Sequence, residues 1–148
     1  MLNCIKKLWP INSWFKKLPY HVRQGKWGEA QAVRFLRKNG YLIEARNVCF
    51  RDIGELDIIA SCKHTLIFVE VKTRKSERYG RPVDAVHIKK RRRLEKCAIH
   101  YVKRYHLRPE FIRFDVIEVI GEVHWLAQVR ITHLENVFTL SPKARLWW

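Results

Sequence analysis

A glutamate and a lysine stand two residues apart at the end of an apolar run, in the stretch LIFVEVKTR over residues 66–74. Alternate side chains of a β-strand share a face, so Glu70 and Lys72 are predicted to project on the same side. A carboxylate can bind a divalent cation, and a nearby lysine can orient or deprotonate a water molecule because burial readily lowers the pKa of a lysine. The same two residue types also make an ordinary salt bridge.

A second carboxylate comes near this pair in a predicted β-hairpin. The runs ELDIIAS and TLIFVEVKTR flank a short polar stretch, and a two-residue turn at Lys63 and His64 would place Asp57 directly opposite Glu70. The Cβ atoms of directly opposed residues lie roughly 4.5–5.5 Å apart. One hairpin would therefore hold two carboxylates within reach of a single metal ion.

A third carboxylate is expected from a helix predicted over about residues 25–39. Glu29 precedes Ala32, Val33 and Leu36 by three, four and seven residues, so it lies in line with the apolar stripe of that helix. Carboxylates facing a core are rarely left without a partner. A metal ion or Lys72 would supply one.

These residue types suit the hydrolysis of a phosphodiester. Mg²⁺ prefers oxygen ligands, usually one or two carboxylates together with waters and a substrate phosphate. Asp57 and Glu70 are therefore predicted to bind Mg²⁺ or Mn²⁺, with Lys72 positioning water and Glu29 assisting as the fourth catalytic group. The alternative is that Glu70 and Lys72 are only a salt bridge and that Asp57 is paired with an arginine.

The elements that must position these residues are predicted from apolar periodicity and turn signals. A helix between the third and fourth strands requires a parallel crossover in an otherwise antiparallel sheet. We therefore expect an α/β fold with a mixed β-sheet flanked by helices, in the order α-β-β-β-α-β-β. The expected strands are 41–50, 55–61, 65–74, 111–120 and 123–132, and the second helix is 83–105; residues 133–148 predict no element.

Composition favours a basic protein that binds a polyanion. The 148 residues include 30 Lys and Arg against 14 Asp and Glu, a formal net charge of +16, which favours nucleic acid or an anionic membrane surface. The apolar fraction of 47% excludes a generic disordered chain. The four cysteines form no CxxC pattern, and no apolar run approaches the roughly 18 residues of a membrane helix. A cytoplasmic protein without a transmembrane segment is expected.

Two clusters of cations are predicted to contact nucleic acid. One lies in the loop that leaves the third strand, and the other opens the second helix. Such contacts with phosphate give affinity without sequence information and weaken with salt, although a solvated helix face is the alternative. The predicted nucleic-acid-binding residues are Arg74, Lys75, Arg78, Arg81, Lys89, Lys90, Arg92 and Arg93. Asp115, in the stretch RFDVI, is not assigned to the metal.

The ordered segments GKWGEAQAVRFLRKNGY, RN, GELDIIA, FVEVKTR, YGRPVDAV and RFDVI resemble the bacterial YraN-type family over about residues 22–138. This resemblance implies a restriction-endonuclease-like fold and a PD-(D/E)xK nuclease site. On this sequence the site falls on Asp57, Glu70 and Lys72, with Glu29 as the helical acid. Leu56 stands where the motif has its proline. Archaeal Holliday-junction resolvases are similar in this arrangement, which implies branched or duplex DNA as the substrate.

Three segments are predicted along the chain. Residues 1–22 form a basic and aromatic N-terminal extension, 23–138 the nuclease-like domain and 139–148 a C-terminal tail. Residues 1–20 either pack loosely or contact a membrane surface or a partner protein. The expected function is a metal-dependent nuclease acting on DNA, and the alternative is a non-catalytic nucleic-acid-binding module on the same fold.

Overall fold

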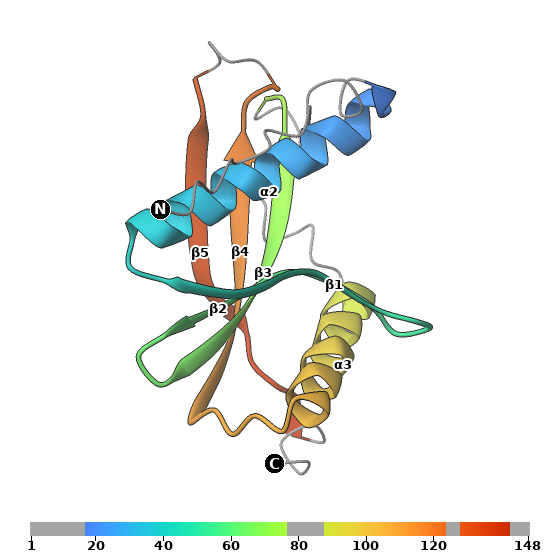
Figure 1. Ribbon diagram of the computed structural model, residues 1–148, viewed down its shortest axis with the longest axis vertical. Coiled ribbons are helices and arrows are strands. Elements are labelled where there is room, and N and C mark those ends of the chain that lie inside the picture. The colour runs from blue at the N-terminus through green and yellow to red at the C-terminus, as the bar shows by residue number, and fades with distance from the viewer. Residues whose placement is uncertain (1–16, 77–87, 124–127, 143–148) are drawn as a thin grey trace, which may run out of the picture.

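The computed structural model describes residues 17–76, 88–123 and 128–142, which form a five-stranded sheet with a helix on each face (Figure 1). The two helices are α2 (Tyr20–Lys38) and α3 (Ile88–Arg104). The strands are β1 (Leu42–Phe50), β2 (Gly54–Cys62), β3 (Thr65–Arg74), β4 (Phe111–Ile120) and β5 (Arg130–Phe138). This confirms the predicted α/β class and the order α-β-β-β-α-β-β.

The strands lie side by side in the order of the chain, from β1 to β5. β3 and β4 pair in parallel and every other neighbouring pair is antiparallel. Helix α3 lies between β3 and β4 in the sequence, because a parallel pair cannot be joined by a tight turn. The predicted mixed sheet, similar in arrangement to restriction endonucleases, is therefore what the chain forms.

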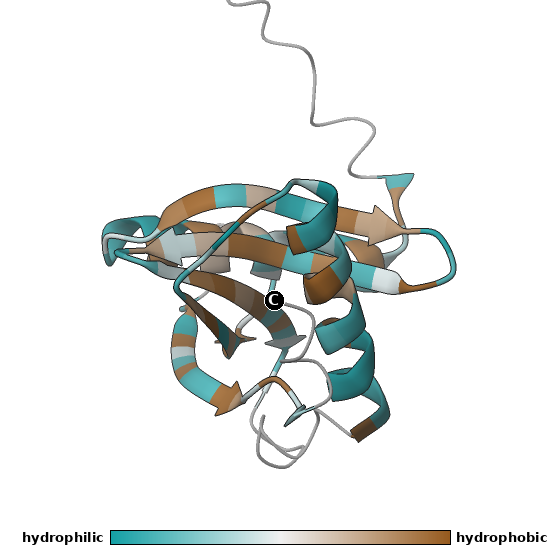
Figure 2. Ribbon diagram, turned by 90° about the horizontal axis from the view of Figure 1, so that it is seen from below, coloured by the Kyte–Doolittle hydropathy of each residue, from teal (hydrophilic) through white to brown (hydrophobic). Residues whose placement is uncertain are grey.

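The sheet is covered by two separate hydrophobic cores. Leu66 and Phe68 of β3 face α3, whereas Ile67 and Val69 face α2, as the twofold alternation of a strand requires. Figure 2 shows hydrophobic residues of α3 turned toward the strands and polar residues turned outward. Because β3 is covered on both faces, any polar side chain near its end emerges beside a packed core.

Helix α2 begins earlier than the expected start near residue 25. It starts at Tyr20, and the carbonyl of Pro19 accepts hydrogen bonds from the N–H groups of Val22 and Arg23, both at 3.1 Å. The two glycines of GKWGE resemble a loop signal, and this explains why the first turn was not predicted. The earlier start brings Tyr20 beside Lys75, which directly follows β3.

The last strand was predicted over 123–132, and this was wrong. β5 begins at Arg130 and continues to Phe138, through residues for which the sequence predicted no element. Residues 124–127 lie outside the described part of the chain. The pairing of β5 with β4 shifts register between Phe114 and Val116, where the buried Asp115 accepts a hydrogen bond from the backbone N–H of Asn136 at 2.9 Å. Tertiary pairing therefore overrides the weak strand propensity of THLEN.

Several expectations fall on residues that the structure does not describe. They are the N-terminal extension as far as residue 16, residues 83–87 of the second expected helix, and the end of the tail from residue 143. Within the described residues, no helix is both long enough and apolar enough to cross a membrane.

Candidate nuclease site

The predicted β2–β3 hairpin is confirmed. Its pairs run from Cys62 opposite Thr65 to Ile58 opposite Val69, which is the register of a two-residue turn at Lys63 and His64. Asp57 and Glu70 are the next positions of this register, at the point where the backbone ladder ends.

Beyond the last backbone pair of the hairpin, the side chain of Asp57 bonds to the backbone of β3. Its Oδ2 accepts a hydrogen bond of 2.8 Å from the backbone N–H of Val71. The carboxylate thus lies between the two strands, and a backbone donor at the end of β3 is satisfied by a side chain. One oxygen of Asp57 is held in place by this bond, which orients the carboxyl group beside β3.

Glu70 is buried, with only 4% of its surface exposed, and its two oxygens have different surroundings. Oε1 lies 2.7 Å from Nζ of Lys72 and 3.1 Å from Nζ of Lys90. Oε2 is also buried, yet it has no hydrogen-bond partner among the described residues. A buried carboxylate oxygen is normally paired, so this atom is a ready ligand for a cation.

Burial, followed by the negative charge of Glu70, raises the pKa of Asp57 from an ordinary value of 3.8 to about 7. The N–H of Val71 and the ammonium of Lys90 oppose this shift of the pKa. Asp57 is therefore close to half-protonated at neutral pH. Two carboxyl groups that resist being charged together are typical of sites that bind a cation or move a proton.

Glu29, on α2, is the third carboxylate that lines a cavity with Asp57 and Glu70. It is partly buried rather than enclosed in the core, and burial raises the pKa of its carboxyl group. A hydrogen bond with the side chain of Asn47 and the charge of Arg46 act against this rise in pKa. Gly28, the preceding residue, lets α2 approach β3 closely enough to bring Glu29 to the site, because a Cβ there would lie 1.8 Å from Oγ1 of Thr73.

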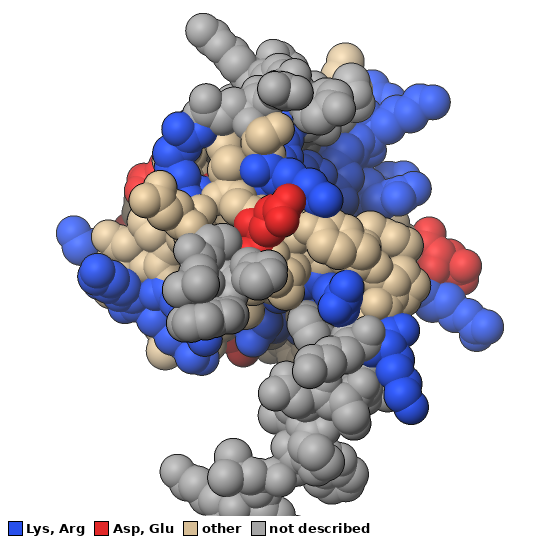
Figure 3. All heavy atoms as spheres, turned by 90° about the horizontal axis from the view of Figure 1, so that it is seen from above, with Lys and Arg blue, Asp and Glu red and all other residues tan. Residues whose placement is uncertain are grey.

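A cavity of about 520 Å³ lies between the first turns of α2 and the ends of β2 and β3. It brings together three of the four predicted catalytic residues, Glu29, Asp57 and Glu70; Lys72 contacts Glu70 from outside the lining. The other lining residues are Tyr20, His21, Gln24, Gly25, Val71, Thr73 and Lys75. Figure 3 views the end of the molecule toward which β3 and β4 run, where a small acidic group lies among basic side chains.

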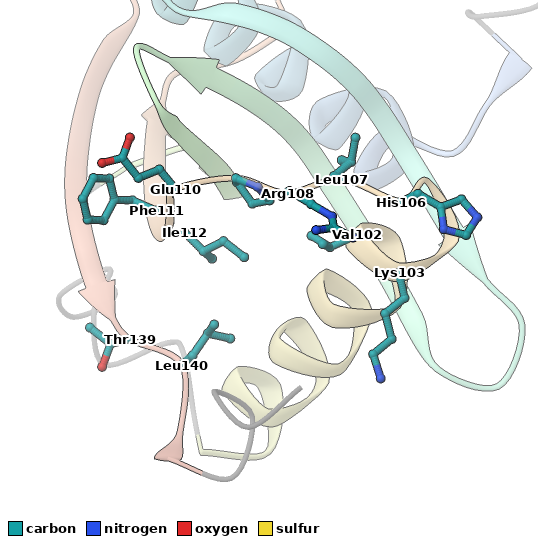
Figure 4. A pocket seen from close by; sticks show the side chains of 11 residues that line it. Val102, Lys103, His106, Leu107, Arg108, Glu110, Phe111, Ile112, Thr139 and Leu140 are labelled. Atoms are coloured by element: carbon teal, nitrogen blue, oxygen red, sulfur yellow. The ribbon is translucent and has the colours of Figure 1, made fainter. Parts of the chain in front are cut away.

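A larger cavity of about 860 Å³ lies at the opposite end of β4, beside the end of α3 (Figure 4). Leu107, Phe111, Ile112 and Leu140 contribute much of its lining, and Glu110 is its one carboxylate. It contains none of the predicted site residues, so its size does not make it the chemical centre.

The donor set of the smaller cavity suits a hard cation held partly by water. Among residues 17–76, 88–123 and 128–142, no group of three or more His, Cys, Asp or Glu side chains is arranged around one ion position. A structural zinc site needs four protein ligands, whereas Mg²⁺ commonly takes one or two carboxylates and completes its shell with water. Asp57 and Glu70, with the unpaired Oε2, fit the second description.

Lys90 is the site residue whose role the sequence missed. The sequence assigned it to the outward basic face, but its ammonium turns inward to Glu70. Lys90 precedes the buried Leu94 by four residues and therefore lies above it on the inner stripe of α3. This four-residue spacing from Lys90 to Leu94 could have predicted that Lys90 turns toward the sheet.

The other predicted nucleic-acid-binding residues occupy several environments. Nε of Arg74 lies 3.6 Å from Glu118, and Nζ of Lys75 lies 3.7 Å from Glu122. On α3, the exposed residues of this set are Lys89, Arg92 and Arg93. Arg78 and Arg81 lie outside the described residues. The exposed face of α3 can therefore meet a polyanion without disturbing the carboxylates.

Asp115 belongs to a separate buried network, in agreement with its exclusion from the metal site. Its carboxylate accepts two hydrogen bonds from Arg113, at 2.9 and 2.8 Å, and lies 2.8 Å from Nε2 of His133. It also accepts a bond from the backbone N–H of Asn136, so the contacts with His133 and Asn136 join β4 to β5, while those with Arg113 stay within β4.

A mixed five-stranded sheet between two helices, with an Asp and a Glu-x-Lys at the ends of adjacent central strands, defines a restriction-endonuclease-like α/β domain. The model of the family described as uncharacterised protein family UPF0102 matches residues 28–119, and the chain belongs to this YraN-type family. A UPF0102 protein of Symbiobacterium thermophilum is 50% identical over 97 residues, covering 66% of this chain and 81% of the relative. Another, of Clostridioides difficile, is 40% identical over 115 residues, covering 78% and 96%.

Proposed function

We propose that this protein is a metal-dependent endonuclease that hydrolyses phosphodiester bonds of DNA, including branched or otherwise structured DNA. The observation that carries the proposal is the asymmetry of Glu70. One oxygen of this buried carboxylate is neutralised by Lys72 and Lys90, while the other has no partner among the described residues and belongs to a cavity shared with Asp57.

Asp57 and Glu70 are the residues that would hold Mg²⁺ or Mn²⁺, through their carboxylate oxygens. When bound, such an ion neutralises charge on the phosphate and increases the acidity of a water molecule. Asp57 must lose its proton to act as a ligand, and its raised pKa makes this step depend on pH near neutrality.

Lys72 and Lys90 would have different roles in this reaction. Both contact the same oxygen of Glu70, so Lys90 can remain its counter-ion while Lys72 turns its N–H donors toward the attacking water or the phosphate. Lys72 suits this role because 28% of its side chain is exposed beside the buried glutamate. Glu29, which lines the same cavity, would accept a hydrogen bond from that water.

The charge of the protein supports a polyanionic substrate. A net charge of +16 and the exposed cations of α3 favour a polyanion with a regular backbone, and the contacts would be with phosphates rather than with bases. A cytoplasmic location, where DNA is present, is consistent with the free thiols of Cys49, Cys62 and Cys97.

The test is cleavage of linear duplex, single-stranded and four-way-junction DNA by the purified full chain with Mg²⁺ or Mn²⁺. Asp57→Asn is the sharpest variant, because an amide oxygen can still accept the hydrogen bond from Val71 while binding a cation poorly. It should abolish cleavage, and Lys72→Gln should reduce it by about 10²–10⁴-fold. A cooperative thermal unfolding transition for each variant would show that it is folded.

A non-catalytic nucleic-acid-binding module is the second candidate, favoured by the exposed cations on α3 that lie away from the carboxylates. It predicts salt-sensitive DNA binding that survives Glu70→Gln, with no cleavage by the wild type under any of these conditions. That combination of results would replace the nuclease proposal.

A further inference from the structure

Gly25 lies within α2 at a position where the fold does not require glycine. Among the residues that the structure describes, a Cβ built on Gly25 would meet no heavy atom within 4 Å. Its backbone is helical, and glycine is among the least favourable residues in a helix interior. Packing and backbone geometry therefore give no reason for a glycine here.

The contrast with Gly28, three residues further along the same helix, is direct. A Cβ on Gly28 would lie 1.8 Å from Oγ1 of Thr73, so the close approach of α2 to β3 excludes any side chain. Gly28 is explained by the contact between the helix and the sheet. Gly25 faces open space instead.

The open space beside Gly25 is the cavity that contains Asp57 and Glu70. A long side chain at position 25 has this space to occupy. The glycine thus leaves this wall of the cavity without a side chain.

Tyr20 and Lys75 also line this cavity and form a pair suited to a nucleotide. Nζ of Lys75 lies 4.3 Å from the centroid of the Tyr20 ring, and Tyr20 is 40% exposed. Tyrosine rings stack on nucleic-acid bases whatever their sequence, and an ammonium binds phosphate. The ammonium of Lys75 is also 3.7 Å from Glu122, in a pair that is half-exposed on both sides and therefore open to exchange with a phosphate.

We propose that the sugar–phosphate backbone of the cleaved DNA strand passes over Gly25 on its way to the carboxylates, with Tyr20 and Lys75 contacting a neighbouring nucleotide. This inference rests on the proposed nuclease function and deepens it. It places the path of the strand along the first turns of α2, on the opposite face of the sheet from the basic residues of α3.

The test uses Gly25→Leu in the full chain, with Gly25→Ala as a smaller step at the same position. Both substitutions favour the helix, but the leucine side chain is much longer than that of alanine. Binding is measured by fluorescence anisotropy with fluorescein-labelled single-stranded and four-way-junction DNA in Ca²⁺, and cleavage in Mg²⁺. We expect Gly25→Leu to melt no lower than the wild type, to weaken binding by about tenfold and to lose cleavage, with Gly25→Ala falling between this variant and the wild type in both measurements.

A folded Gly25→Leu variant with wild-type affinity and cleavage would overturn the proposed path. If this variant does not fold, Tyr20→Ala is the deciding variant, and we expect its DNA binding to weaken by about fivefold or more. Unchanged DNA binding by Tyr20→Ala would overturn the proposed path. A wild type that neither binds nor cleaves DNA would overturn the nuclease function as well. An active wild type with unaffected variants would overturn the strand path alone.

Discussion

The ammonium of Lys90 lies 3.1 Å from Oε1 of Glu70, the same oxygen that Lys72 contacts at 2.7 Å. The three residues come from α3 and β3, so the contact ties the helix to the strand at the point where the candidate site begins. Two cations on one oxygen compensate the burial of Glu70 and leave its other oxygen available. The positions of Lys72 and Lys90 are therefore explained by a single carboxylate.

Removing Lys90 should destabilise the fold even though its side chain is partly exposed. We expect Lys90→Ala to lower the free energy of unfolding by about 1–2 kcal/mol, because the buried Glu70 loses one of two charged hydrogen-bond donors. Urea denaturation measures the change. Lys89→Ala, at the exposed neighbouring position, is the control and should have almost no effect; equal losses for the two variants would argue against the Lys90–Glu70 contact.

Asp57 should make stability fall as the pH rises toward neutrality. Its pKa is raised from an ordinary value near 3.8 to about 7, chiefly by burial and then by the charge of Glu70. Between these two values the folded protein holds a proton that the unfolded chain releases, so the free energy of unfolding decreases with pH across this window. The favourable contribution is complete below about pH 4 and lost above about pH 7.

Denaturation of the wild type and of Asp57→Asn at several pH values between 4 and 8 checks this sign. The asparagine does not titrate, so the wild type should lose stability relative to the variant as the pH rises. Parallel curves for the two proteins would show that the pKa of Asp57 is not raised. Cation binding should show the opposite trend with pH, because a ligand carboxylate must be deprotonated.

Manganese should bind between Asp57 and Glu70. In crystals soaked with Mn²⁺, we expect anomalous density in the cavity at about 2.1 Å from a carboxylate oxygen of each residue. Glu70→Gln should remove this density, because the neutral amide is a much poorer ligand. Density at another position, with none in this cavity, would contradict the assignment of the metal ligands.

The two glycines at the start of α2 should respond to alanine in opposite directions. Gly25→Ala should stabilise the protein by about 1 kcal/mol through helix propensity, because its Cβ meets nothing. Gly28→Ala should destabilise it by about 1–3 kcal/mol, since its Cβ would overlap Thr73. Thermal or urea unfolding measures both, and Thr73→Ala should partly rescue Gly28→Ala by making room.

Asp115 should be essential for stability but not for cation binding. Asp115→Ala leaves Arg113 and His133 without their buried partner, and we expect a loss of about 3–5 kcal/mol. Chemical denaturation measures this loss. At a temperature where the variant is still folded, its affinity for Mn²⁺ should match that of the wild type. Loss of Mn²⁺ binding would instead show that the Asp115 network supports the carboxylates of the cavity.

The hairpin shows how much of the candidate site was predictable. Two apolar runs and a two-residue turn determine which residues face one another, because side chains alternate strictly along a strand. The register from Cys62–Thr65 to Ile58–Val69 was therefore predicted correctly, and it ends one position before Asp57 and Glu70. The spacing on α2 likewise predicted that Glu29 would turn toward the sheet.

Other features depend on contacts between residues far apart in the sequence. No local sequence pattern predicts where β5 begins and ends. Its polar residues His133 and Asn136 are kept in the strand by their contacts with the buried Asp115 of β4. The bond from Val71 to Asp57 arises only where two strands separate around a side chain.

The sequence by itself determined the order of the elements and the hairpin register, since these follow from periodicity and turn chemistry along a short stretch of chain. Only the tertiary structure decided that Lys90 turns inward and that, among the described residues, one oxygen of Glu70 is paired and the other is not. It also decided that Gly25 borders a cavity while Gly28 lies against Thr73. These features depend on how closely α2 and α3 pack against the sheet. That distance is set by all the side chains of the two cores together, and no single segment encodes it.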